Sequence, residues 1–206
     1  MKKLTEIISV GFNPFFMPFF GVLILFKYHG YFSVVYRTDF INSVLLLSFI
    51  LTLVFPLISV YLLFRSKIIT NINLDKKEER ITPTIITLCY YFAFYYFLRR
   101  INGLDTVILS GIFGGYLALI LSLFITKYWK ISLHTLGISS LAGLFVGAVQ
   151  VKYMEHTGVI IFLFILIGLM GTSRLILKKH TPAQVYAGAI LGFSVPYLCV
   201  VFDVFL

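Results

Sequence analysis

Seven long apolar runs, separated by short polar segments, dominate this sequence. They cover residues 7–27, 41–64, 82–98, 103–126, 132–151, 157–172 and 183–204. A helix needs about 20 apolar residues to cross a hydrocarbon core of about 30 Å, and these runs approach that length. They are also too continuously apolar for the alternating strands of a membrane barrel, and a chain in lipid must satisfy its own backbone hydrogen bonds. We therefore expect an all-α fold, a polytopic membrane helix bundle with about six to seven transmembrane helices.

The composition agrees with a membrane protein, because 60% of the residues are hydrophobic and only 12% are charged. No linker or shift in composition divides the chain, so we expect a single integral membrane domain over residues 1–206. The net charge of +9 comes from Lys and Arg in short runs between the apolar segments. Such residues typically anchor and orient membrane spans, so nucleic acid is not an expected partner.

The polar segments can be assigned to faces, since each span changes the side of the membrane. Residues 65–81, 127–131 and 173–182 then share one face with the N-terminus, and 12 of the 17 Lys and Arg residues fall there. The first run is interrupted by Asn13 and Pro14 and lacks the cleavage site of a signal peptide, so it is counted as a membrane span. The positive-inside rule would place the shared face in the cytoplasm.

The last of these segments carries a recognisable pattern. Ser173-Arg174 is followed by five residues, then His180, three residues and Gln184. This order resembles the third signature of the type 2 phosphatidic acid phosphatase superfamily, Ser-Arg, five residues, His, three residues, Asp. The pattern departs from the signature at Gln184, where the family has Asp. With the segments described next, the resemblance covers a core of about residues 76–192.

Two other segments on the same face resemble the remaining signatures. Ser132-Leu133-His134 is similar to Pro-Ser-Gly-His, without the Pro and the Gly. Lys76 or Lys77, with Arg80 and Pro83, matches the residue types of Lys, six residues, Arg-Pro, with a different spacing. The family usually has these two motifs around one loop, whereas two apparent spans separate them here. The family also usually exposes its site on the outer or lumenal side, so the side of this face in the cell membrane is left open.

The resemblance implies a hydrolase that forms a phosphohistidine intermediate without a metal or other cofactor. His180 would be the nucleophile, His134 the general acid, and Gln184 would stand where the family's Asp orients the nucleophile. The residues implied in phosphate binding are Arg174, Arg80, Lys77, Ser132 and Ser173. Guanidinium groups suit this task because they remain charged and donate bidentate hydrogen bonds to phosphate oxygens.

Gln184 leaves two functions open. If a helix starts at Pro182, Thr181 is its N-cap and Gln184 completes a capping box, which is a purely structural role. An amide also lacks the charge that would stabilise an imidazolium. The sequence therefore predicts a lipid phosphate or pyrophosphate phosphatase or, alternatively, a non-catalytic relative that binds or helps transport an anionic lipid. An unrelated transporter is less supported, because the spans carry neither paired charges nor an evident inverted repeat.

Overall fold

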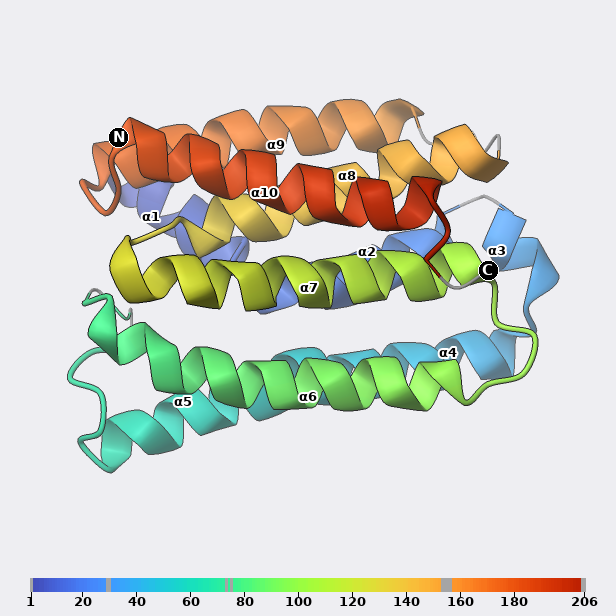
Figure 1. Cartoon of the computed structure of the whole chain (residues 1–206), viewed down its shortest axis with the longest axis horizontal. Coiled ribbons are helices and arrows are strands. Elements are labelled where there is room, and N and C mark those ends of the chain that lie inside the picture. Colours follow the sequence, from blue (N-terminus) through green and yellow to red (C-terminus); the bar gives the residue numbers. More distant parts are fainter. Residues whose placement is uncertain (1, 29–30, 73, 75, 153–156, 205–206) are drawn as a thin grey trace.

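The computed structural model describes residues 2–28, 31–72, 74, 76–152 and 157–204, and every regular element in these ranges is a helix (Figure 1). This confirms the expected all-α fold. The elements are α1 (Lys2–Gly11), α2 (Phe16–Lys27), α3 (Tyr31–Val35), α4 (Thr38–Ser48), η1 (Phe49–Val54), α5 (Phe55–Arg65), η2 (Glu78–Arg80), α6 (Ile81–Arg99), α7 (Thr106–Tyr128), α8 (Leu133–Lys152), α9 (Thr157–Ile176) and α10 (Pro182–Val201).

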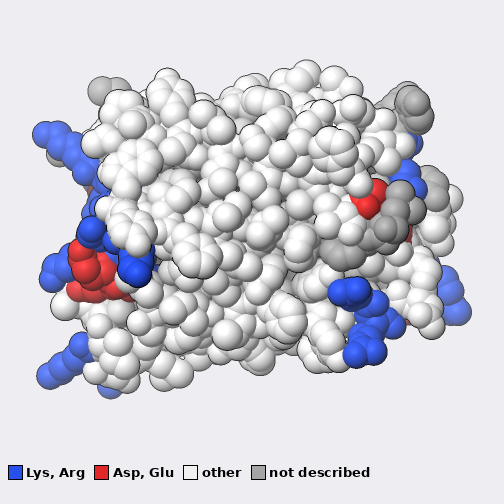
Figure 2. Space-filling view, viewed as in Figure 1, with Lys and Arg blue, Asp and Glu red and all other residues white. Residues whose placement is uncertain are grey.

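Six helical segments in the described residues are long and apolar enough to cross a membrane. They are Thr38–Arg65, Glu78–Arg99, Thr106–Tyr128, Leu133–Lys152, Thr157–Ile176 and Pro182–Val201. Figure 2 shows charged residues at the two ends of one face of the bundle, with a broad band without Lys, Arg, Asp or Glu between them. Many large hydrophobic side chains of the six segments are exposed. These features identify a multi-pass membrane protein.

The expectation of one continuous helix over residues 7–27 is wrong. Helices α1 and α2 meet at a bend of 69°. The Asn13 side chain accepts a hydrogen bond from the Phe15 amide at 3.1 Å, and Pro14 disfavours helical backbone in the residue before it. The bend places α1 against α9, at the end of the bundle that carries the signature-like segments (Figure 1).

The three polar segments that the sequence assigned to one face do lie at one end of the bundle (Figure 1). Hydrogen bonds join these segments and the residues that directly follow them. Arg80 Nη1 donates to the Ile131 carbonyl at 3.2 Å, and the Ser132 amide donates to the Gln184 carbonyl at 3.2 Å. Residues about 100 positions apart in the sequence, such as Arg80 and Gln184, therefore belong to one polar region.

Close packing of α8 against α10 fixes two of these segments relative to each other. An ideal Cβ on Gly192 would lie 2.9 Å from Leu136 Cα, and one on Gly188 would lie 2.6 Å from Thr135 Oγ1. Side chains at these two positions would collide with α8, so the close approach requires glycine.

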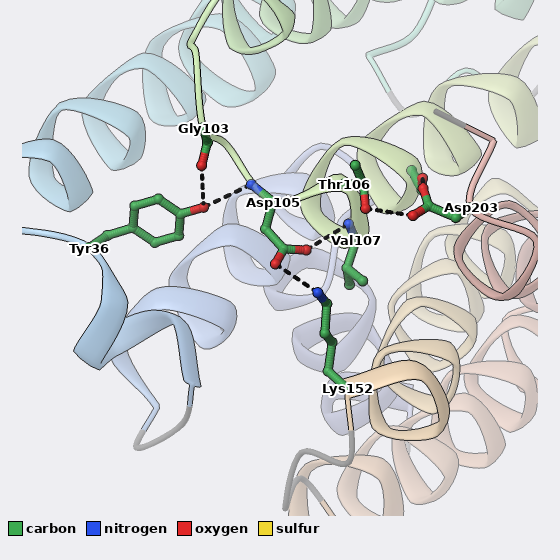
Figure 3. A network of polar contacts seen from close by, with 8 residues as sticks. Tyr36, Gly103, Asp105, Thr106, Val107, Lys152 and Asp203 are labelled. Atoms are coloured by element: carbon green, nitrogen blue, oxygen red, sulfur yellow. Dashed lines mark hydrogen bonds and ion pairs between the residues drawn. The ribbon is translucent and has the colours of Figure 1, made fainter. Parts of the chain in front are cut away.

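A separate polar network ties the helices together at the opposite end (Figure 3). Asp105 caps α7 by accepting from the Val107 amide at 2.9 Å, and it pairs with Lys152 of α8 at 3.1 Å. Asp203, just after α10, accepts from Thr106 at 2.6 Å. Helices α7, α8 and α10 are thus joined at the end away from the signature-like segments.

Candidate functional site

A cavity of about 630 Å³ extends into the bundle from the end that carries the signature-like segments. Helices α1, α2, α6, α7 and α8 form most of its wall. Its polar wall residues include Ser9, Arg80, His134, Arg174 and Lys179. Three of the residues predicted from the sequence, Arg80, His134 and Arg174, therefore meet on one cavity although they come from three different segments.

Arg80 and Arg174 are both buried, with 5% and 6% of their surfaces exposed. Arg80 Nε donates to the Leu74 carbonyl at 2.8 Å, which holds the guanidinium beside the cavity. Arg174 Nη1 donates to Ser9 Oγ at 2.7 Å. Two positively charged groups held in a largely apolar protein interior favour an anion between them, because burial strengthens charge-assisted hydrogen bonds.

Hydrogen bonds around Gln184 determine which nitrogen of His180 carries its proton. Gln184 Oε1 accepts from the Thr181 amide at 3.2 Å, so this atom is the carbonyl oxygen of the side chain. His180 Nδ1 lies 3.1 Å from the same oxygen and must donate to it. In the neutral ring Nε2 then has the lone pair. This Nε2 is buried and has no hydrogen-bond partner among the described residues.

The surroundings of His180 also keep its ring neutral. Burial lowers the pKa of His180 to about 3, and the Arg80 and Arg174 charges contribute to the same shift. A lone pair on Nε2 is what a nucleophilic imidazole requires. His180 is not among the residues that line the cavity, but it lies within electrostatic range of both guanidinium groups and of His134.

The depressed pKa predicts acid sensitivity. An unfolded histidine protonates near pH 6.5, whereas folded His180 resists protonation down to about pH 3. Its contribution to stability should therefore be complete above about pH 6.5 and be lost progressively as the pH falls to about 3, by up to about 1.4 kcal/mol per pH unit. Thermal unfolding in lipid nanodiscs between pH 7 and pH 4 would measure this slope. His180→Gln should reduce the slope, and an unchanged slope would contradict the prediction.

His134 is held by a residue that the sequence did not suggest. Its Nε2 lies 3.1 Å from the Ser9 carbonyl, which can only accept, so Nε2 carries a proton and Nδ1 is the ring atom left to exchange one. Ser9 thus connects His134 with Arg174, since its hydroxyl accepts from that arginine. Ser9 reaches the site because α1 is bent back from α2, and no sequence spacing signals that geometry.

The other predicted phosphate ligands do not line the cavity. Ser132 is fully buried, and its hydroxyl accepts from the Thr135 amide at 3.5 Å at the start of α8. Ser173 is buried within α9. Lys77 Nζ instead donates to the Tyr128 carbonyl at 3.4 Å. The sequence assigned Lys179 no role, but it lies on the cavity wall just after a left-handed residue, Lys178, with φ of 52°.

Comparisons with known proteins found no matching family model, no matching curated protein and no matching solved structure. The likeness to the phosphatase superfamily therefore rests on the signature-like residues alone. What the structure adds is the convergence of Arg80, His134 and Arg174 on one cavity, with His180 within electrostatic range of all three.

Proposed function

We propose that the protein is a membrane-embedded phosphatase that removes the phosphate or pyrophosphate of a lipid through a phosphohistidine on His180. One observation carries this proposal. The neutral His180 ring has a buried Nε2 lone pair without a partner among the described residues, within electrostatic range of two buried arginines. A buried nitrogen without a hydrogen bond lowers the stability of the free protein, and a bound substrate would supply the missing partner.

His180 does not line the cavity in the free protein, so in the first chemical step its ring pivots about the Nδ1 bond to Gln184 and brings Nε2 to the bound phosphate. Nε2 then attacks phosphorus and the bond from phosphorus to the lipid oxygen breaks. The negative charge of the bound phosphate offsets the nearby guanidinium groups and favours the protonated ring of His134. Protonated His134 gives the lipid oxygen its proton, from Nδ1, while the Ser9 carbonyl keeps hold of Nε2. Arg80 and Arg174 stabilise the charge spread over the remaining phosphate oxygens. Throughout, Gln184 accepts from Nδ1 of His180 and holds the ring in orientation.

In the second step, water attacks the phosphohistidine and gives its proton to His134, which acts as a base. The nitrogen–phosphorus bond breaks, inorganic phosphate leaves, and the electron pair returns to Nε2 of His180. Both starting protonation states are restored. No step requires a metal, and no group of three or more His, Cys, Asp or Glu residues in the described chain could hold one.

Gln184 favours a second candidate function, a non-catalytic protein that binds or helps transport an anionic lipid. Its Oε1 already serves as the acceptor for the Thr181 amide at the start of α10. The amide is also neutral and gives less support to a cationic ring than a carboxylate would. Arg80 and Arg174 would bind the lipid headgroup equally well in such a protein.

Gln184→Asp separates the two functions. In a phosphatase, the carboxylate should raise phosphate release by at least about tenfold, within the roughly 10⁴-fold that losing the Asp charge costs a serine protease triad. The assay uses several lipid phosphates and pyrophosphates in nanodiscs with excess chelator. Gln150→Asp is the matched control, because Gln150 hydrogen-bonds Tyr197 away from the site.

Two other outcomes would change the conclusion. Suppose that neither wild-type protein nor Gln184→Asp releases phosphate, and that Arg174→Ala weakens the binding of lipid phosphate. This result would establish the second candidate, a non-catalytic protein that binds an anionic lipid. Loss of phosphate release in folded Gln184→Asp would show that the amide itself is needed, and that interpreting it as a missing charge is wrong.

A further inference from the structure

The cavity that the arginines line continues into a section with a mainly apolar wall, the apolar section. Along α8 its wall runs from His134 through Gly137 and Leu141 to Leu144. A helix rises about 1.5 Å per residue, so this wall extends about 15 Å inward from His134. Beyond the polar end, the cavity therefore penetrates deeply between the membrane spans.

Helix α7 shows where this section ends. It runs antiparallel to α8 and contributes Leu119, Gly115 and Gly111 to the cavity wall, in order away from the polar end. A Cβ on Gly111 would collide with the Leu144 side chain, so α7 and α8 touch there. With Phe94 of α6, which also lines the cavity, this contact marks its inner end.

The dimensions match one lipid chain in its own leaflet. A hydrocarbon core of about 30 Å leaves about 15 Å for each leaflet, which is the depth of the apolar wall. A chain bound there would stay at the depth it has in the bilayer, while its phosphate remained level with Arg80 and Arg174. The volume of about 630 Å³ is also in the ordinary range for a ligand site, about 300–1,000 Å³.

From this continuity and depth we infer that the apolar section binds the hydrocarbon chain of the phosphorylated substrate, and that chains reaching past Gly115 are preferred. The inference rests on the proposed function for its phosphate end. It adds that the length of the hydrocarbon chain held inside the bundle determines which substrates the enzyme prefers. Because the chain leaves lipid that is as apolar as the cavity, its preference comes from packing against the cavity wall and not from leaving water.

Gly115 offers a direct way to block this section. A Cβ at Gly115 would meet no atom within 4 Å, and Gly115 lies on the cavity wall, so a larger side chain there would enter the cavity. Gly168 in the middle of α9 supplies the matched control. It also has nothing within 4 Å and is not one of the residues that line the cavity.

The experiment compares hexadecyl phosphate with butyl phosphate on Gly115→Phe, Gly168→Phe and wild-type protein in nanodiscs. Equilibrium binding and phosphate release are measured for both compounds. We expect Gly115→Phe to weaken hexadecyl phosphate binding by about tenfold or more, since forcing a bulky side chain into an occupied site has an effect of that order. Butyl phosphate should bind all three proteins equally, and Gly168→Phe should behave as wild type. Gly115→Leu serves as the test if Gly115→Phe does not fold.

The two proposals fail differently. The chain-binding inference is wrong if folded Gly115→Phe binds hexadecyl phosphate as wild type does, or if both compounds lose affinity equally. Neither result would affect the measured phosphate release. Binding that depends on chain length and on Gly115, without phosphate release by wild-type protein, would support the chain site and refute the phosphatase.

Discussion

Replacing His180 by alanine should abolish phosphate release from lipid phosphates. The variant lacks the nitrogen that would attack phosphorus, so the covalent intermediate cannot form. The residual rate should fall to that of protein-free vesicles, a larger effect than any other single substitution in the site. Incubation with radiolabelled lipid phosphate, followed by alkaline denaturation to preserve phosphohistidine, should leave label on wild-type protein and none on His180→Ala.

A neighbouring residue outside the cavity wall provides the control for this experiment. Ser173→Ala changes a buried residue of the same signature-like segment that does not line the cavity, and it should retain labelling. Both variants must elute as folded protein with the wild-type retention volume. Full phosphate release by His180→Ala, or label that persists in it, would refute the mechanism.

Replacing His134 by alanine should slow lipid phosphate hydrolysis by about 10²–10⁴-fold, the usual contribution of a general acid. The loss should depend on the leaving group. A lipid alkoxide is strongly basic and needs a proton as it leaves, whereas the phenolate of nitrophenyl phosphate leaves without one. The variant should therefore be much closer to wild type on nitrophenyl phosphate than on lipid phosphate, with both rates measured under the same conditions.

This comparison separates proton transfer from simple positioning. If His134 only positions Arg174 through Ser9, its removal should slow both substrates equally. Ser9→Ala tests that connection, because it removes the hydroxyl that accepts from Arg174 but keeps the carbonyl that orients His134. It should weaken phosphate binding more than it lowers turnover.

Much of the fold was predictable because a chain in lipid must satisfy its own backbone hydrogen bonds, and few folds do so. The six spans follow from length and hydrophobicity, and the meeting of the signature-like segments at one end follows from counting crossings. The bend between α1 and α2 was marked by Asn13 and Pro14, but hydrophobicity alone suggested a continuous span. Whether a polar interruption kinks or breaks a span depends on its contacts with the neighbouring helices. The local sequence does not show those contacts.

The site was predictable in part for the same reason. Arg80, His134 and Arg174 reach the cavity because their segments share one end of the bundle. Ser173 does not line it, because the side of α9 that faces the cavity depends on packing between the helices. Ser132 lies just before α8, where its hydroxyl accepts from the Thr135 amide instead. Ser9 was missed because its position depends on the angle between α1 and α2 and on no motif.

Under the proposed phosphatase function, the shared use of Gln184 Oε1 has an evolutionary consequence. That oxygen accepts from the Thr181 amide as well as from His180, so selection for a stable start to α10 would preserve an acceptor at position 184 even in a lineage that had stopped hydrolysing phosphate. His180 Nε2 has no such second duty, since it bonds no described residue and its burial costs stability. Once substrate is no longer handled, drift should replace His180 before Gln184, and His180 is the position by which active descendants of this chain can be told from inactive ones.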